Sequence, residues 1–182
     1  EATLPVMFYG GNGADTLVGG QADDYLNGNS GNDIFDGREG NDKLVGGADR
    51  DSMYGGEGDD TLNGQGANDT IRGGLGDDKL KGGDGYDRLY ETGDWNFVAS
   101  DTQLTGMGTD ILRTLEDLKL IGGASANSMD ASAFSGQVIL WGSGGDDTMS
   151  GGPGADRLNG GPGNDEIFGN DGADTVFGGS GD

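Results

Sequence analysis

The sequence contains no cysteine and no histidine. Without cysteine there can be no disulfide, no thiol redox chemistry and no thiolate metal site, and without histidine the commonest ligand of zinc, iron and copper is missing. The chain also has no phosphate-binding P-loop motif. Because the usual catalytic groups are absent and the many carboxylates are better explained as ligands, we expect no enzymatic activity from these residues.

Apolar residues and cations are scarce as well. Only 31% of the 182 residues are hydrophobic, and 10 Lys plus Arg face 33 Asp plus Glu, for a net charge of −23. No apolar run approaches the ~20 residues of a membrane-spanning helix, so we expect no membrane insertion. Nucleic-acid binding needs clustered cations, so no such partner is expected. On composition alone, the chain could be an acidic linker that never folds.

Glycine is abundant instead, and it is periodic. Residues 10–90 are nine consecutive nonapeptides without insertion or deletion, beginning GGNGADTLV and GGQADDYLN. Position 1 is always Gly, position 6 is always Asp, and position 8 is always Leu, Phe, Met or Ile. A strict period of this length predicts an all-β solenoid of stacked repeats and argues against the unfolded linker.

Each nonapeptide divides into a turn and a short strand. Glycine at positions 1, 2 and 4 permits positive φ and close packing, which favours a tight turn over the first six residues. Positions 7–9 then form a strand in which position 8 points inward. Burial of one aliphatic side chain yields only ~1.5–3 kcal/mol, whereas each ordered residue loses ~1–2 kcal/mol of backbone entropy. We therefore expect a bound metal to supply the missing stability.

The Asp that recurs at position 6 of every repeat indicates which metal binds. Oxygen is the only ligand type that these turns offer, from carboxylates and main-chain carbonyls. Flexible sites of many oxygens favour Ca²⁺, at ~2.3–2.6 Å, over the smaller Mg²⁺. The position-6 residues of the first block are Asp15, Asp24, Asp33, Asp42, Asp51, Asp60, Asp69, Asp78 and Asp87.

Outside the first block the pattern changes twice. Residues 1–9 carry no repeat and are expected to be a lead-in or cap strand, and residues 91–141 are a non-repeat insert. Within the insert, NFVAS and TQL predict a short hairpin, and the later apolar runs predict β-helix coils without metal. Trp95 and Trp141 could form a glycan platform, but packing is the favoured interpretation.

The nonapeptide returns at Gly142. Residues 142–182 hold four repeats and a truncated fifth, whose position-6 residues are Asp147, Asp156, Asp165 and Asp174. We expect Met149, Leu158, Ile167 and Val176 to point inward. Asp182 falls at position 5 of an unfinished repeat, so we expect the chain to be a fragment of a longer protein.

These units resemble the RTX (repeats-in-toxin, hemolysin-type) family, whose calcium-binding nonapeptide is G-G-x-G-x-D-x-U-x. The resemblance implies a right-handed parallel β-roll, or β-solenoid, in two calcium-binding blocks joined by a metal-free β-helix and hairpin insert. It also implies that calcium lies between turns 18 residues apart. The earlier turn would supply the carbonyls of positions 2 and 4 and its Asp, and the later turn the carbonyls of positions 1 and 3 and its own Asp.

Carried onto this sequence, the family pattern gives about nine calcium sites. They pair Asp15 with Asp33, Asp24 with Asp42, Asp33 with Asp51, Asp42 with Asp60, Asp51 with Asp69, Asp60 with Asp78, Asp69 with Asp87, Asp147 with Asp165, and Asp156 with Asp174. In the same order, their carbonyl ligands would be Gly11, Gly13, Gly28 and Ser30; Gly20, Ala22, Gly37 and Glu39; Asn29, Gly31, Gly46 and Ala48; Arg38, Gly40, Gly55 and Glu57; Gly47, Asp49, Gly64 and Gly66; Gly56, Gly58, Gly73 and Leu75; Gln65, Ala67, Gly82 and Asp84; Ser143, Gly145, Gly160 and Pro162; and Gly152, Gly154, Gly169 and Asp171.

Departures from the pattern fall on glycines and never on the position-6 Asp. Position 4 is Ala22, Asp49 or Ala67 in three repeats, and position 2 is Asn29, Arg38 or Gln65 in two others and in the repeat that holds Ala67. A Cβ at a turn that needs positive φ adds strain, so we expect weaker sites there and not lost ones.

The family implies a function at the level of a module. We expect a calcium-binding domain that folds on meeting extracellular millimolar calcium and so supports the export and folding of a larger, type I secreted bacterial protein. The alternatives are a calcium-rigidified structural or adhesive spacer, or a non-catalytic module of a secreted protease, lipase or polysaccharide-modifying enzyme. The expected partners are calcium, the parent polypeptide and a type I secretion apparatus, and the expected state is a monomer outside the cell.

Overall fold

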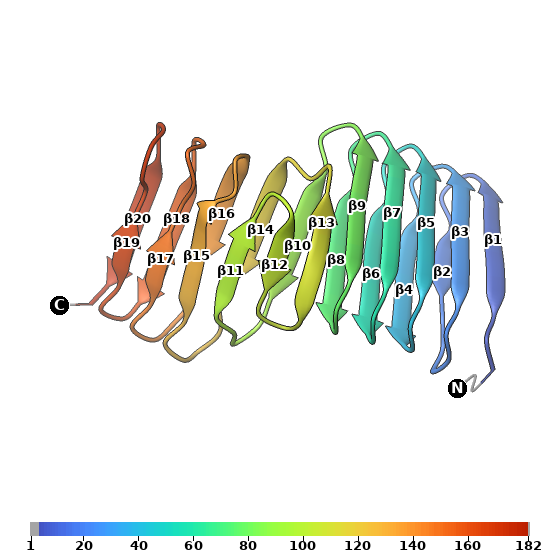
Figure 1. Cartoon of the computed structure of the whole chain (residues 1–182), viewed down its shortest axis with the longest axis horizontal. Helices are drawn as coiled ribbons and strands as arrows, with labels where there is room; N and C mark the ends of the chain where they lie inside the picture. Colours follow the sequence, from blue (N-terminus) through green and yellow to red (C-terminus); the bar gives the residue numbers. More distant parts are fainter. Residues whose placement is uncertain (1–3, 182) are drawn as a thin grey trace. The chain divides into compact units, whose positions relative to one another are not determined.

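The computed structural model describes residues 4–181, and every regular element among them is a β-strand (Figure 1). The described residues form two compact units. Unit 1 contains the described residues up to Leu89 together with Met107–Leu115, and unit 2 contains Tyr90–Gly106 together with the described residues from Glu116 onward. No helix of the described chain is long and apolar enough to cross a membrane.

Unit 1 consists of two sheets of parallel strands. In one sheet the order is β1 (Met7–Asn12), β3 (Tyr25–Ser30), β5 (Lys43–Ala48), β7 (Thr61–Gly66), β9 (Lys79–Asp84) and β13 (Thr109–Arg113). In the other it is β2 (Thr16–Val18), β4 (Ile34–Glu39), β6 (Ser52–Glu57), β8 (Thr70–Leu75) and β10 (Arg88–Thr92), of which Arg88 and Leu89 belong to this unit. Successive nonapeptides thus alternate between the sheets, and two of them make one coil (Figure 1).

The pairing of these strands follows the period of the sequence, because two nonapeptides make 18 residues. Leu26 pairs with Leu44 and Leu44 with Leu62, while Phe35 pairs with Met53, so partners lie 18 residues apart. This constant offset, together with strands that are all parallel, confirms the predicted β-solenoid of stacked coils.

Unit 2 continues the same kind of architecture with one exception. One of its sheets has the order β12 (Gln103–Thr105), β11 (Phe97–Ser100), β15 (Ser128–Ala133), β17 (Thr148–Ser150) and β19 (Glu166–Phe168). The other has the order β14 (Asp117–Ile121), β16 (Gln137–Trp141), β18 (Arg157–Pro162) and β20 (Thr175–Ser180). The exception is the pair β11 and β12, which is antiparallel and confirms the predicted hairpin. The insert therefore consists of a hairpin and coils of parallel strands, such as β14 and β16.

The core is a column of position-8 side chains. Leu26, Leu44, Leu62 and Ile71 are fully buried, and the insert adds further apolar residues such as Phe97. Val176 lies in register with the buried Leu158 and so on the inward face, but it is 47% exposed because no described strand pairs with β20 on its far side. Trp95 and Trp141 are 44% and 43% exposed, so neither belongs to the core, and the Lys119 ammonium lies 4.6 Å from the centroid of the Trp141 ring.

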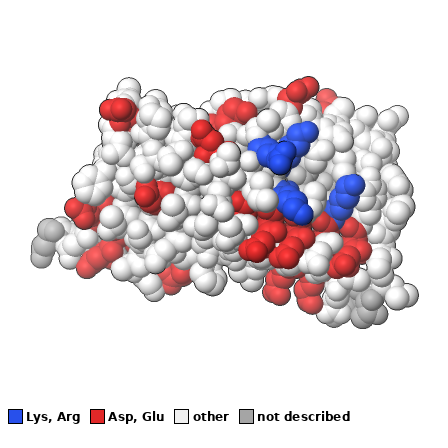
Figure 2. Space-filling model, in the orientation of Figure 1, with Lys and Arg blue, Asp and Glu red and all other residues white. Residues whose placement is uncertain are grey.

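Charge is distributed unevenly over the surface. Figure 2 shows acidic residues scattered over one whole face and a single group of cations among them. The four cations on the outer face of the β1–β13 sheet of unit 1 are Lys43, Lys79, Lys81 and Arg113.

Candidate metal sites

The turns of the nonapeptides stack into rows because each coil contains two repeats. Within unit 1, one row carries Asp15, Asp33, Asp51, Asp69 and Asp87, and the other carries Asp24, Asp42, Asp60 and Asp78. In every stacked pair, the backbone N–H of the earlier Asp donates to Oδ1 of the Asp in the next turn. These bonds join all of the predicted pairs, from 2.7 Å for Asp24 and Asp42 to 3.0 Å for Asp156 and Asp174.

The second carboxylate oxygen has a different environment. Oδ2 is buried and accepts no hydrogen bond in Asp15, Asp33, Asp42, Asp51, Asp60, Asp69, Asp78, Asp147 and Asp165. A buried acceptor without a partner ordinarily destabilises a fold by ~1–3 kcal/mol, and by more if it is charged. A row of such atoms therefore fits a bound cation.

Glycine at position 1 keeps the space beside Oδ2 open. A Cβ on Gly46 would collide with Asp51 Oδ2 and would lie 2.7 Å from the carbonyl oxygen of Gly64 in the next turn. A Cβ on Gly28 would be in the same position between Asp33 Oδ2 and the Gly46 carbonyl. The structure thus brings together the earlier Asp and the later position-1 carbonyl, which are two of the predicted ligand types.

Most of the turns share a left-handed backbone at positions 2 and 4, and we call these open turns. Gly11 and Gly13 have φ of 105° and 106°. The expectation that non-glycine residues would be strained there is confirmed for Asn29, Arg38, Asp49, Gln65 and Ala67, whose φ values lie between 71° and 81°.

Two turns, residues 19–24 and 151–156, differ, and we call them closed turns. The N–H of Gly20 donates to Asp24 Oδ2 (2.7 Å), and the N–H of Gly152 donates to Asp156 Oδ2 (2.8 Å). Neither turn has positive φ at positions 2 and 4, so the expectation of strain is wrong for Ala22. Because a main-chain N–H already occupies Oδ2, these two turns lack the empty acceptor of the open turns.

Burial shifts the pKa of the stacked carboxyls. Loss of solvation, reinforced by the neighbouring carboxylates in the row, raises the pKa of Asp51 and Asp60 to about 7 against an ordinary 3.8. Burial also raises the pKa of Asp42 and Asp78 to about 6. The shifts are limited by the hydrogen bond that each Oδ1 accepts. Burial and the neighbouring carboxylates therefore disfavour the ionised form of these carboxyl groups, and a nearby cation would stabilise it.

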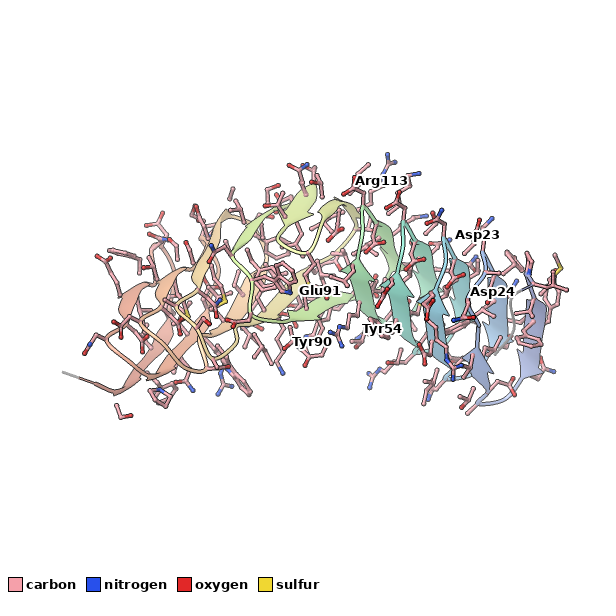
Figure 3. The ribbon with its side chains drawn as sticks, turned by 90° about the horizontal axis from the view of Figure 1, so that it is seen from below. Asp23, Asp24, Tyr54, Tyr90, Glu91 and Arg113 are labelled. Atoms are coloured by element: carbon pink, nitrogen blue, oxygen red, sulfur yellow. The ribbon has the colours of Figure 1, made fainter. Side chains whose placement is uncertain are left out.

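Main-chain carbonyls are essential to any cation site here. Among residues 4–181 no three acidic side chains converge on one point. Each stacked pair supplies two carboxylates, so the remaining oxygens must come from the turns, as calcium allows. Figure 3 shows the alternation within one turn, where Asp23 lies at the exposed rim beside the buried Asp24.

Two residues of the insert occupy places in these rows that the repeat pattern did not reveal. Asp110 accepts the N–H of Asp78 (3.1 Å), and Asn127 donates its N–H to Asp147 Oδ1 (2.7 Å). Weak signals were present, because residues 105–113 read TGMGTDILR and residues 122–130 read GGASANSMD. The first departs from the repeat at position 1, and the second replaces the position-6 Asp with Asn.

Comparison with known proteins gives a family for most of the chain. The model of the RTX calcium-binding nonapeptide repeat (4 copies) matches residues 9–44, 36–71, 54–89, 121–158 and 150–182. Together these segments cover well over half of the sequence, and they leave out residues 90–120. No curated protein matches the chain.

Proposed function

Because the chain belongs to the RTX calcium-binding nonapeptide repeat family, we propose that it is a folding module that calcium switches on outside the cell, within a larger secreted protein. The observation that carries this proposal is the row of buried Oδ2 atoms without partners, in a chain of net charge −23. The module needs no catalytic group of its own, and it would serve the export and folding of the protein that contains it.

Calcium would be held by pairs of stacked turns. In the pair formed by Asp33 and Asp51, for example, the candidate ligands are these two carboxylates, the carbonyls of Asn29 and Gly31, and the carbonyls of Gly46 and Ala48. When bound, calcium would supply positive charge to the oxygens that the folded turns bring together. The chain's own part is to orient these oxygens: the Asp33 N–H holds Asp51 Oδ1 (2.9 Å), which leaves Oδ2 for the ion.

The environment would decide whether the module folds. Calcium sites of extracellular modules typically have Kd values of ~10⁻⁴–10⁻³ M, far above free calcium in the cytosol. A ligand at ten times its Kd stabilises the folded state by about 1.4 kcal/mol per site. In unit 1 each row contains several sites that share carboxylates, so the increments add within one stack of coils, which would fold cooperatively outside the cell.

A calcium titration tests the proposal. Circular dichroism of the chain in excess chelator should show little β structure, and addition of calcium into the millimolar range should produce the β signal in a steep transition. Magnesium at the same concentration is the control and should be much less effective. A chain that has its full β signal in chelator, or one that millimolar calcium leaves unfolded, would contradict the proposal.

A further inference from the structure

We propose that the turn ending at Asp110 completes one more calcium site with the turn at residues 73–78, in a segment that the family model does not match. The ligands of this site would be the carbonyls of Gly74 and Gly76, the carboxylates of Asp78 and Asp110, and the carbonyl of Met107. The inference rests on the proposed function, because it extends calcium binding to residues where no repeat was recognised.

The hydrogen bonds between these two turns repeat those of a recognised pair. Asp78 N–H donates to Asp110 Oδ1 (3.1 Å), and Ile111 N–H donates to the Asp78 carbonyl (2.7 Å). In the preceding pair of the row, Asp60 N–H donates to Asp78 Oδ1 (2.8 Å), and Lys79 N–H donates to the Asp60 carbonyl (2.9 Å). The outer edge matches too, since Thr109 N–H donates to Asp77 Oδ1 (2.8 Å).

The earlier turn of this pair is open. Gly74 and Gly76 have φ of 111° and 128°, as in the other open turns. Asp78 is only 1% exposed, and its Oδ2 has no hydrogen-bond partner. The turns are also packed closely, because a Cβ on Gly108 would collide with the Gly76 carbonyl, just as a Cβ on Gly76 would collide with the Gly58 carbonyl.

The site escapes recognition because of its spacing. Asp110 lies 32 residues after Asp78 instead of 18, and the additional residues of this coil include the hairpin β11–β12. The strand register resumes beyond it, with Ile111 opposite Lys79 and Arg113 opposite Lys81. Asp110 therefore extends the row of Asp24, Asp42, Asp60 and Asp78 by one turn, at the end of a lengthened coil.

In the turn at residues 122–127, by contrast, the polar atoms of the position-6 side chain have hydrogen-bond partners. Asn127 Oδ1 accepts the N–H of Gly123 (2.8 Å), and its Nδ2 donates to Asp94 Oδ1 (3.1 Å). Hydrogen bonds from Ser125 and from the Asn127 amide lower the pKa of Asp94. An amide thus meets the needs of this turn without an ion, whereas the turn at Asp78 leaves a buried carboxylate oxygen unmatched.

Counting bound ions by native mass spectrometry in calcium tests the site. Asp110→Asn keeps the acceptor for the Asp78 N–H and removes the charge, so the count should fall by one. Asp77→Asn, which removes the same charge from the exposed rim of the same turn pair, should leave the count unchanged. Asp78→Asn should lower it by two, because Asp78 also serves the pair with Asp60.

The outcomes separate this site from the general proposal. A wild-type chain that binds no calcium would contradict both. A wild-type chain that binds calcium, with an Asp110→Asn variant that keeps the full count, would contradict the additional site alone. If Asp110→Asn does not fold in saturating calcium, the Asp78→Asn count decides, since a loss of one ion instead of two also contradicts the site.

A second, independent observation concerns the outer face of the β1–β13 sheet in unit 1. The residues at positions 7 and 9 of its strands, of which only Val45 is buried, are Met7, Tyr9, Tyr25, Asn27, Lys43, Val45, Thr61, Asn63, Lys79, Lys81, Ile111 and Arg113. Four of these are cations and none is acidic, in a chain with 33 acidic and 10 basic residues. We call these twelve residues the cationic face, and Figure 2 shows its cations as a blue group.

The geometry of the cationic face points to an anionic polymer as its partner, and we infer that it binds a linear polysaccharide bearing carboxylates or sulfates. Arg113 lies beside Lys81 in the sheet, and all four cations are exposed. Within the described residues, none of them forms an ion pair with a carboxylate of the chain. Such a flat array of separate cations matches charges spaced along a chain better than it matches one small anion.

Aromatic and polar groups on the same face favour a sugar over a nucleic acid. The Tyr25 and Tyr9 rings contact each other at a tilt of 55°, with their centroids 5.8 Å apart. The Lys43 ammonium lies over the Tyr25 ring, 5.5 Å from its centroid. Thr61 offers a hydroxyl between Lys43 and Lys79 in the register. Four cations suit the low charge density of a polysaccharide, whereas duplex DNA carries a charge every ~1.7 Å. Binding would also require calcium, because the unneutralised turns repel any anion.

Binding of hyaluronate oligosaccharides, measured by calorimetry in calcium, tests this inference. The Lys79→Gln, Lys81→Gln, Arg113→Gln triple variant should bind at least tenfold more weakly than wild type. The control triple variant Arg50→Gln, Arg72→Gln, Arg157→Gln loses the same charge elsewhere and should bind as wild type does. Absence of binding to both hyaluronate and dextran sulfate, equal losses in the two variants, or tighter binding of single-stranded DNA would each overturn it.

Discussion

At the scale of single residues, the position-6 Asp performs two tasks with its two oxygens. In Asp51, Oδ1 accepts the N–H of Asp33 (2.9 Å) and so fixes the stacking of the coils. Oδ2 is buried without a partner and is the atom that a cation would bind. One side chain therefore couples the stacking of the coils to the binding of the ion.

An Asp inside a row should matter more than one at its start. Asp51 is bonded to the turns on both sides, through Asp33 and Asp69, whereas Asp15 is bonded only to Asp33 in the next turn of its row. We expect Asp51→Ala to abolish two sites and Asp15→Ala one, with a higher calcium midpoint and a shallower transition for Asp51→Ala. Calorimetric stoichiometry and the dichroism titration measure both effects, and equal losses in the two variants would argue against shared carboxylates.

Acid should favour the folded form when calcium is absent. Burial raises the pKa of Asp51 and Asp60 from 3.8 to about 7 in the fold. For an acid with a raised folded-state pKa, the stability is full below pH 3.8 and is lost as pH rises through 6–7. In calcium-free buffer the β signal should therefore grow as pH falls from 7 towards 4. In the presence of calcium, protons compete for the same oxygens, so calcium affinity should fall over that range.

One outcome of the pH titration would contradict this prediction. A calcium-free chain that loses β structure on acidification from pH 7 to 5 would show that its carboxyls are stabilised as anions without metal. Asp94 provides an internal contrast, because hydrogen bonds from Ser125 and Asn127 lower its pKa.

At the scale of elements, the turn is the unit that distinguishes one candidate site from another. The closed turns at residues 19–24 and 151–156 each come first in a row, where the preceding coil presents a plain backbone N–H, from Val6 or Val138, to the Asp Oδ1. They serve one predicted site each, with Asp42 and with Asp174. We therefore expect those two sites to be the weakest, since an ion must displace the N–H of Gly20 or Gly152 from Oδ2.

Filling the space beside Oδ2 should remove binding at one turn. Gly46 does not have positive φ, so Gly46→Ala adds no φ strain and puts its methyl group against Asp51 Oδ2 and the Gly64 carbonyl, one of which must move. We expect at least one ion fewer by native mass spectrometry and a higher calcium midpoint. Gly178→Ala is the matched control, because Gly178 is also at position 1 and a Cβ there meets nothing within 4 Å. Identical behaviour of the two variants would mean that the space beside Oδ2 is not used.

The sequence predicted the repeating features well because a strict period repeats one local solution. The parallel register, the inward position 8 and the stacking of Asp33 on Asp51 all follow from the period. The backbone of Ala22 and the role of Asp110 did not, because they depend on the neighbouring coil and not on the nonapeptide itself. Asp110 meets Asp78 only after a coil of unequal length, which no fixed spacing reveals.

At the scale of the whole molecule, charge is the term that calcium changes most. Nine calcium ions would bring +18 against a net charge of −23, and one more at Asp110 would bring +20. Without them, the stacked carboxylates repel one another, and the apolar column of one residue per nonapeptide is too thin to hold the coils together. Folding and neutralisation are therefore expected to be one event.

This coupling predicts how the dimensions of the chain respond to salt. For 182 residues, an unfolded chain has a radius of gyration of about 45 Å, and a globular fold one of about 16 Å. In chelator, small-angle scattering should give a value near the unfolded one, which should shrink between 0.01 and 1 M NaCl as the Debye length falls from about 30 to about 3 Å. In millimolar calcium the radius should be much smaller and insensitive to NaCl, because the ions sit inside the turns. If 1 M NaCl alone produced the compact, β-rich state, screening would suffice, and the buried Oδ2 atoms would not need a specifically bound cation.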